Sequence, residues 1–488
     1  MNGLWVPIII VTYFAVLLLI SRFTGGKGGG SNDAFFLGNR QSPWYIVSIA
    51  MIGTSLSGVT FVSVPGMVRS IDMTYMQTVL GFFAGYLIIA RILLPLYYNL
   101  QLTSIYAYLG RRFGPCAYLT GASFFLLSKM IGAAARFYLV ALILQTFVFD
   151  AWGVPFAVTT IASVALVWGY TFRGGIKTIV WTDMAQCVCF IAMLGMIIWS
   201  VTKTLGLDAA GFVDSLVTSP RFRVFEWNNL HSTQHFAKQF VSGIFIAIVM
   251  TGLDQDMMQK NLSCRNLREA QRNMYTYGFM FIPVNFLFLC LGVIILDLAA
   301  RQGIALPASS DDILPMFCNS RMLGAAMPVF FTIGIIAAAF SSADSALAAL
   351  TTSFCVDIMG IEKEPNEARA LRIRRSTHIG AAITFAIIIL VFKALNNRSV
   401  IDAIYMIASY TYGPLLGLFA FGLFTRRIPL DRHIPFIAIL SPIICFALSR
   451  WLEHLFNYTF SYEMLLINGG LTFAGLLAGS KKMGVISS

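Results

Sequence analysis

Charged residues are scarce in this chain: Asp, Glu, Lys and Arg together make up only 11% of its 488 residues. Long polar stretches are scarce as well. The longest segments between apolar runs, at 202–237, 300–322 and 357–375, are too short to fold as soluble domains. The mean hydropathy of +0.76 excludes an ordinary soluble protein. We therefore expect residues 1–488 to form a single membrane domain.

Residue types that build catalytic and metal sites are also few. The chain has five histidines and neither an H-E-x-x-H nor a G-x-S-x-G motif, which argues against an intramembrane enzyme. Most of its eight cysteines fall inside apolar segments, where a thiol packs as a small apolar group. We therefore predict no disulfide framework, no organic cofactor and no transition-metal site.

Apolar stretches of about 20 residues, the length of a membrane-spanning helix, recur throughout the chain. Thirteen are predicted, at roughly 3–22, 44–70, 75–98, 117–148, 152–171, 178–201, 238–255, 273–299, 323–356, 376–395, 400–424, 434–449 and 463–480. The first lacks the basic start and cleavage site of a signal peptide, so we expect it to remain as a spanning helix. The predicted fold class is an all-α integral membrane protein.

The distribution of basic residues predicts the orientation. With the N-terminus outside, 21 of the 34 Lys and Arg residues fall in the inner loops and the C-terminal tail, and 10 fall outside. Cytoplasmic loops carry the excess of Lys and Arg in membrane proteins. We therefore expect an outside N-terminus and a cytoplasmic C-terminus. The net charge of +12 then needs no nucleic acid to explain it.

A cluster of hydroxyl groups lies deep in the segment 331–357. Ser341, Ser342 and Ser345 follow one side of the predicted helix, and buried polar groups in a membrane need a partner. Serine oxygens are good ligands for a small hard cation and poor ligands for a transition metal. This cluster therefore indicates a sodium site in a transporter.

The second apolar segment contains many residues that disfavour a continuous helix. They are Gly53, Thr54, Ser55, Ser57, Gly58, Thr60 and Pro65. Unwound backbone at membrane depth persists where it lines a cavity or holds an ion, although small residues also allow close helix packing. Gly243 and Gly252 lie in a comparable position five segments later. This spacing predicts two inverted five-helix repeats, at 44–201 and 238–424.

Several charged residues lie inside predicted spanning helices and need explanation. Arg136 follows small residues that leave open volume, and a guanidinium cannot lose its proton, so it requires an anion. That anion is either a solute carboxylate or an internal acid such as Asp183 or Asp344. Lys129 either lines the inward pathway or meets lipid headgroups or a neighbouring acid.

Five stretches carry a family resemblance. They are GTSLSGVTFVSVPG (53–66), GGIKTIVWTDMAQ (174–186), TGLDQDMMQKNLSCRNLREAQRN (251–273), AAAFSSADSALAALTTSFCVDI (337–358) and SYTYGPLLGLFAFGLF (409–424). In sequence and order they resemble the sodium:solute symporter family, which includes bacterial sialic acid, proline and pantothenate carriers and the sodium/glucose transporters. The resemblance implies the leucine-transporter fold, with an extra helix at 3–22 and two more in 434–480.

The resemblance also implies two sets of sodium ligands. The first set comprises the backbone carbonyls of Gly53, Leu56 and Ala338 and the hydroxyls of Ser341 and Ser342. A second sodium site, as in the sialic acid carrier, would comprise Asp183, Ser342 and Ser345, with Asp344 standing where that carrier has a serine. A carboxylate at 344 could strengthen cation binding or carry a proton. Alternatively, these acids could be structural and pair with a buried Arg or Lys.

The solute site implied by the resemblance comprises Ser57, Thr60, Gln77 and Arg136, with the arginine holding a carboxylate. The sugar-carrying relatives use a glutamate on the second core helix and an asparagine on the sixth. Here the corresponding stretches, Tyr75-Met76-Gln77 and FIAIVMTG, have neither residue. We therefore expect a carboxylate-bearing solute. Sialic acid or a related acidic sugar comes first, then proline-like amino acids and monocarboxylates.

The function expected from these patterns is sodium-coupled secondary active symport by alternating access, in a bacterial inner membrane, with a monomer sufficient for transport. A channel is disfavoured because the polar residues cluster at mid-membrane between apolar ends. A solute sensor of the same fold that does not transport, and a symporter of a neutral sugar, remain as alternatives.

Overall fold

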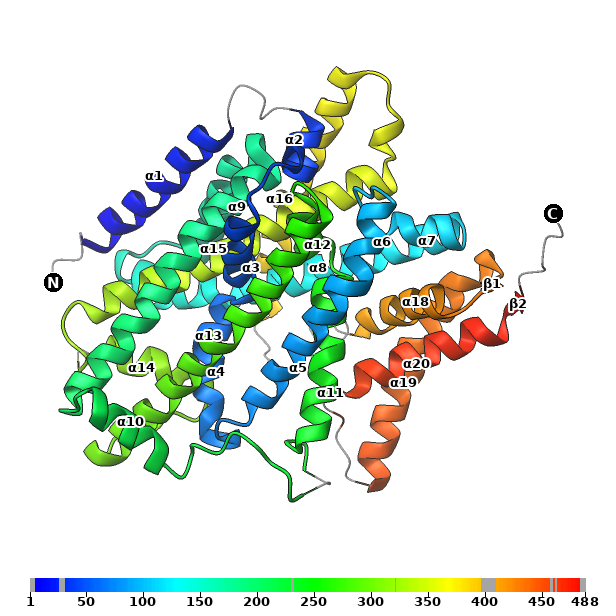
Figure 1. The fold of residues 1–488 in the computed structure, drawn as a ribbon. Coiled ribbons are helices and arrows are strands. Elements are labelled where there is room, and N and C mark those ends of the chain that lie inside the picture. Colours follow the sequence, from blue (N-terminus) through cyan, green and yellow to red (C-terminus); the bar gives the residue numbers. More distant parts are fainter. Residues whose placement is uncertain are drawn as a thin grey trace.

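The computed structural model of the protein describes residues 5–25, 31–229, 232–320, 322–395, 410–456, 460 and 463–482. The chain forms a helical bundle with the peripheral helix α1 on one side and α18, α19 and α20 on the other (Figure 1). Each predicted apolar segment overlaps a helix or a bent helix pair. Residues 400–409 of one segment lie outside the described residues.

The helices before the second bent span are α1 (Trp5–Gly25), α2 (Asn32–Leu37), α3 (Trp44–Ser55), α4 (Gly58–Ile71), α5 (Tyr75–Ile88), α6 (Leu94–Asn99), α7 (Ala107–Arg112), α8 (Pro115–Leu144), α9 (Phe156–Thr204) and α10 (Ala209–Thr218). Those that follow are α11 (Phe236–Ala247), α12 (Gln255–Leu262), α13 (Leu267–Gln302), α14 (Ile313–Asn319), α15 (Met327–Ser353), α16 (Glu367–Leu395), α18 (Tyr412–Phe424), α19 (Ile434–Phe456) and α20 (Glu463–Ala478). The short strands β1 (Arg427–Pro429) and β2 (Ser480–Lys482) pair antiparallel.

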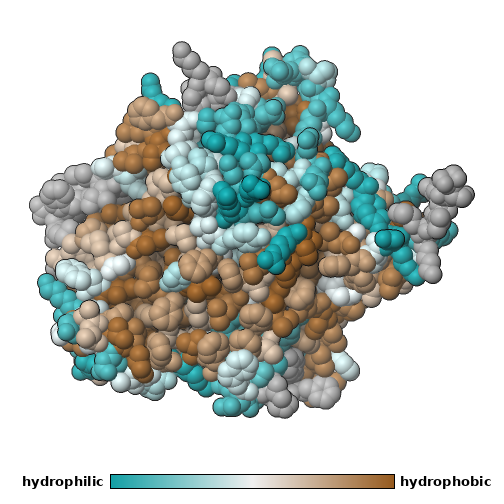
Figure 2. Space-filling view, viewed as in Figure 1, coloured by the Kyte–Doolittle hydropathy of each residue, from teal (hydrophilic) through white to brown (hydrophobic). Residues whose placement is uncertain are grey.

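The surface of the bundle fits a bilayer. A belt of apolar side chains crosses the middle of the face in Figure 2, and hydrophilic residues gather above and below it. Among the described residues, seven helices are long and apolar enough to span a membrane, and two bent helix pairs raise this number to nine. The other four predicted segments correspond to shorter apolar helices, so the count of thirteen spans stays a prediction.

Two spans of the described chain are bent helix pairs and not continuous helices. α3 and α4 are bent by 65° at Leu56 and Ser57, and α11 and α12 by 66° near Asp254. In the described chain the backbone ladder of α3 ends with the bond from Leu56 N–H to Ile52 O, 3.0 Å, and α4 begins with Phe61 N–H to Ser57 O. The carbonyls of residues 53–56 therefore have no partner in either helical ladder.

The second break differs from the sequence expectation in two ways. The predicted segment 238–255 stops too early, because the broken span continues through α12 to Leu262. The break follows Gly252, whereas Gly243 lies inside α11. A Cβ at Gly243 would come within 2.4 Å of the Thr78 carbonyl oxygen on α5, so this glycine permits close helix packing.

The two predicted segments 152–171 and 178–201 are both part of α9, which turns sharply at Gly175. This residue has φ 50° and ψ −138°, a combination that side chains other than glycine rarely adopt. The turn lets α2 pack against α9, and a Cβ at Gly175 would lie 2.5 Å from the backbone of Phe35. One glycine therefore fixes both the bend and the contact.

We expect Gly175→Ala to destabilise the protein by about 2–4 kcal/mol, because backbone strain and overpacking add. The measurement is the apparent unfolding temperature of the detergent-purified protein. Gly169→Ala on the same helix is the matched control, since nothing lies within 4 Å of a Cβ there. Equal unfolding temperatures for the two variants would contradict the role of Gly175 in the bend of α9 and in its contact with α2.

Candidate functional site

A cavity of about 860 Å³ lies beside the first helix break. Its walls come from α3, α4, α5, α8, α13, α14, α15, α18 and the second broken span, and its volume is in the range of small-molecule sites. One end reaches Ser309, Asp311 and Asp312, in the loop before α14, and the other reaches Lys129 and Asp254. Most of the lining is apolar, so the polar groups that it includes decide what can bind.

Arg136 lies in the cavity wall, half buried on α8. Its Nε donates to the Gly132 carbonyl oxygen at 3.1 Å. Among the described residues it forms no ion pair, and the two acids considered as internal partners, Asp183 and Asp344, bond to other groups. The guanidinium therefore keeps donors for a group that enters the cavity.

Ser57 and Thr60 also line the cavity, at the start of α4. Ser57 caps the helix, since its Oγ accepts from Thr60 N–H at 3.3 Å, and the two hydroxyl oxygens are 3.2 Å apart. Gln77 does not reach the described lining. It is fully buried and holds the loop before α11, donating to Gln234 O and accepting from Glu226 N–H.

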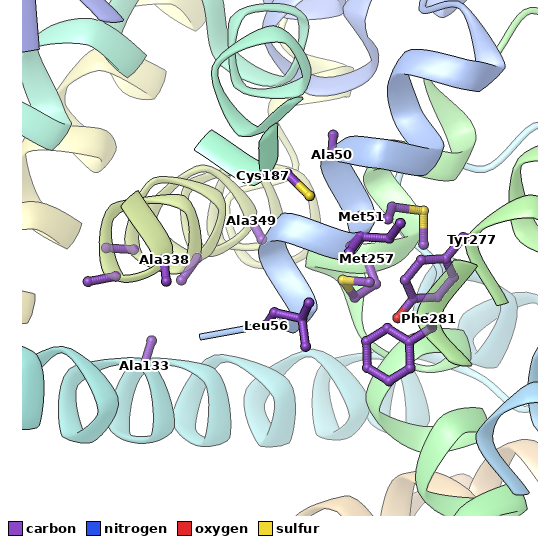
Figure 3. Close-up of a cluster of buried hydrophobic side chains, with 14 of the residues drawn as sticks. Ala50, Met51, Leu56, Ala133, Cys187, Met257, Tyr277, Phe281, Ala338 and Ala349 are labelled. Atoms are coloured by element: carbon purple, nitrogen blue, oxygen red, sulfur yellow. The ribbon is translucent and has the colours of Figure 1, made fainter. Parts of the chain in front are cut away.

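The residues of the predicted first sodium site come from the α3 break and α15. Figure 3 labels Leu56 at the end of α3 and Ala338 on α15. Ser342 Oγ, on α15, lies 3.2 Å from the Ala338 carbonyl and 3.5 Å from the Thr54 carbonyl at the break. One carbonyl left free by the break, that of Thr54, thus faces the Ser342 hydroxyl of α15, and sodium prefers oxygen ligands of this kind.

The residues of the predicted second sodium site surround a lysine. The Lys260 Nζ lies 2.6 Å from Asp183 Oδ2 and 2.7 Å from Ser345 Oγ, and it also contacts Thr54 Oγ1. Neither side chain of the Lys260–Asp183 pair is exposed. Ser341 donates to the other carboxylate oxygen of Asp183 at 2.7 Å. The sequence left open whether Asp183 binds sodium or pairs with a buried Arg or Lys. In the structure it pairs with a buried lysine.

Asp344 is buried beside this cluster and accepts a hydrogen bond from one of its members, the Ser345 hydroxyl, at 3.3 Å. Its Oδ2 accepts from the Tyr170 hydroxyl at 2.9 Å, and its Oδ1 accepts from the backbone N–H of Ser345 at 2.6 Å. These bonds orient the carboxylate within α15 and toward α9. No Arg or Lys in the described chain forms an ion pair with it.

Lys129 forms a second buried ion cluster, at one end of the cavity. Its Nζ lies 2.7 Å from Asp256 Oδ2 and 3.2 Å from Asp254 Oδ2. Asp254 also caps α12 by accepting from the N–H groups of Asp256 and Met257. Lys129 therefore meets neighbouring acids, as one of the sequence alternatives held, and the cluster ties α8 to the second helix break.

A model of the sodium:solute symporter family matches residues 35–430, which is most of the chain. The chain belongs to the sodium:solute symporter family. The symporter resembles the sodium/sialic acid symporter NanT of Aliivibrio fischeri, with 26% identity over 95% of this chain and 92% of the relative. It also resembles the sodium/sialic acid symporter SiaT of Proteus mirabilis, with 24% identity over 98% and 97%.

A solved structure of a substrate-bound, outward-open Na⁺-coupled sialic acid symporter matches the fold. It has 21% identity and a TM-score of 0.83 over 98% of this chain and 99% of that one. The match confirms the predicted leucine-transporter-like fold, which is mostly helical. Family membership confirms that the symporter is a transporter coupled to sodium and not an enzyme.

Sequence reasoning missed Lys260 as a site residue. The residue follows the predicted end of the span at 255, so it was counted among the basic residues of an inner loop. In the structure it lies on α12, which continues the broken span and carries the ammonium to Asp183. The signal in the sequence was the apolar turn Met257–Met258, which indicates that the helix remains inside the bundle.

Proposed function

We propose that this symporter imports a small solute bearing a carboxylate. Sialic acid or a related acidic sugar comes first, then proline-like amino acids and monocarboxylates. The observation that carries the proposal is Arg136, a cation in the cavity wall with no acid paired to it in the described chain. A half-buried guanidinium with free donors favours a planar anion, which it can bind through two hydrogen bonds. The sialic acid symporters among the relatives support the same solute class.

The solute would lie between α8 and the first helix break. Its carboxylate would bind Arg136, and its hydroxyl or amide groups would bind the hydroxyls of Ser57 and Thr60 at the start of α4. A volume of about 860 Å³ accommodates a nine-carbon acidic sugar as well as smaller acids. We leave Gln77 out of this proposed site because its polar atoms bond to the backbone of the loop beside it.

Sodium would bind where the α3 break meets α15. Its proposed ligands are the carbonyls of Gly53, Leu56 and Ala338 and the hydroxyls of Ser341 and Ser342. Such a site joins one helix of each repeat, so the ion stabilises a single relative position of the two helices. Binding of sodium orders the break beside the solute site, and the affinities for ion and solute are therefore coupled reciprocally.

The direction of transport follows from the predicted orientation. With the N-terminus outside, the loop bearing Ser309, Asp311 and Asp312 faces outward, and the cavity reaches it. The Lys129 cluster then lies at the inner end, where it joins α8 to α12 while the cavity is open to the outside. Rocking of the bundle would separate these groups and release sodium and solute into the cytoplasm of a bacterial cell, and a monomer would suffice.

The solute class can be tested by calorimetric binding to the detergent-purified protein. The panel comprises N-acetylneuraminate, proline, pantothenate, a short monocarboxylate and galactose, each in sodium and in potassium buffer. We expect sodium-dependent heat from at least one carboxylate and none from galactose. Binding of galactose alone would contradict the role given to Arg136.

The first sodium site can be tested with Ser342→Ala. Losing one of five oxygen ligands should raise the sodium concentration for half-maximal uptake about tenfold, which corresponds to about 1.4 kcal/mol. The measurement is the sodium dependence of solute uptake into proteoliposomes. Thr332→Ala, on the same helix, is the control because, in the described structure, the Thr332 hydroxyl donates to the backbone of Pro328 on its own helix. An unchanged sodium dependence would remove Ser342 from the site.

A further inference from the structure

We propose that the ammonium of Lys260 permanently occupies the second cation position, so that this symporter couples a single sodium ion to each solute molecule. The proposal deepens the proposed function and rests on it for the first sodium site. It concerns the number of ions moved and the charge carried with the solute.

The contacts of Lys260 are those of a bound cation. An ammonium has three N–H donors, and three oxygens surround this one: a carboxylate oxygen of Asp183, the hydroxyl of Ser345 and the hydroxyl of Thr54. Asp183 and Ser345 are two of the residues that a second sodium ion would use. Both side chains are buried.

A sodium ion and this ammonium exclude each other. An ion on the same oxygens would lie within about 3–4 Å of Nζ, where like charges repel strongly in a buried site. Lysine is also a compact point charge on a flexible stem, which suits a position built for a small cation. Unlike sodium, it is tethered to α12 and cannot leave with the solute.

The first site does not depend on the same oxygens. Ser342 turns toward the carbonyls of Ala338 and Thr54, and no hydrogen bond to Lys260 is present among its described contacts. Ser341 donates to Asp183 and retains an oxygen lone pair for an ion. The lysine thus fills one cation position and leaves the other open, while linking α12 to α3, α9 and α15.

The first test counts ions without any solute. Equilibrium binding of ²²Na⁺ to the purified, full-length protein should saturate at one ion per molecule with a Hill coefficient near one. Two ions per molecule would overturn the proposal and leave sodium symport intact. No bound sodium would overturn both the proposal and the first sodium site.

Two variants test whether Lys260 limits the protein to one bound sodium ion. Lys260→Ala frees the oxygens of Asp183 and Ser345, so the count should rise to two. Adding Asp183→Asn to this variant removes the charged ligand and should return the count to one. A monodisperse Lys260→Ala protein that still binds one ion overturns the proposal. Should the variant fail to fold, the count on the unaltered protein still decides.

A third measurement uses N-acetylneuraminate as a monoanionic probe in proteoliposomes with a fixed sodium gradient. One sodium ion with one monoanion moves no net charge, so a valinomycin-set potential should change steady-state accumulation less than twofold. Two sodium ions would move one net charge, and about 100 mV would then multiply accumulation about fortyfold. The larger effect would overturn the proposal.

Discussion

Arg136→Ala should abolish sodium-driven uptake of an acidic solute. The variant removes the guanidinium that we place against the solute carboxylate, and truncation of one partner of a buried charge pair costs about 2–5 kcal/mol. Affinity should therefore fall at least about thirtyfold, and uptake at micromolar solute should fall below detection. The measurement is the solute concentration dependence of uptake into proteoliposomes.

The fold should tolerate this substitution, because Arg136 forms no ion pair in the described structure and bonds only to the carbonyl of Gly132 on its own helix. Unfolding temperature and ²²Na⁺ binding without solute should therefore stay near those of the unaltered protein. Arg136→Lys keeps the charge without the two-pronged geometry and should retain part of the activity. If Arg136→Ala transports acidic solutes normally, the arginine is structural.

Asp183→Ala should strongly destabilise the protein. It leaves the fully buried ammonium of Lys260 without its counterion, and breaking a buried ion pair on one side costs about 3–5 kcal/mol. We expect a fall of the apparent unfolding temperature, or a large loss of monodisperse protein, on heating in detergent. An unchanged unfolding temperature would show that the pair does not form.

The double variant Asp183→Asn with Lys260→Met is the matched control. It removes both charges and keeps similar side-chain volumes, so neither member of the pair is left as an ion without its partner. It should recover much of the stability lost in Asp183→Ala. Recovery separates loss of the counterion from loss of packing at α9, and a double variant as unstable as the single one would point to packing.

Much of the fold could be predicted because a bilayer restricts the choices. Apolar runs of spanning length and the cluster of glycine and hydroxyl residues after Ile52 predicted the spans and the first break. The position of the second break was less predictable. A glycine serves equally for unwinding, as near Gly252, and for helix packing, as at Gly243, and only tertiary contacts distinguish the two.

The candidate site could also be predicted only in part, because some of its contacts are tertiary. Serines at helical spacing and an arginine among alanines predicted that Ser342 and Arg136 would lie on buried, polar faces, because burial of such groups requires a reason. The pairing of Lys260 with Asp183 joins residues 77 positions apart, and a sequence alone contains no record of that contact. Gln77 was assigned through alignment to relatives, and its amide is used instead by a neighbouring loop.

The most direct test of sodium-coupled transport of a carboxylate solute is accumulation of N-acetylneuraminate in proteoliposomes. It should be followed with an inward sodium gradient and again after an ionophore has collapsed that gradient, with galactose as a parallel solute. We predict that N-acetylneuraminate accumulates above its external concentration only while the sodium gradient is present. This accumulation should be lost in Arg136→Ala, and galactose should not accumulate. If accumulation is the same with and without the sodium gradient, or is greater for galactose, sodium-coupled transport of a carboxylate solute is contradicted.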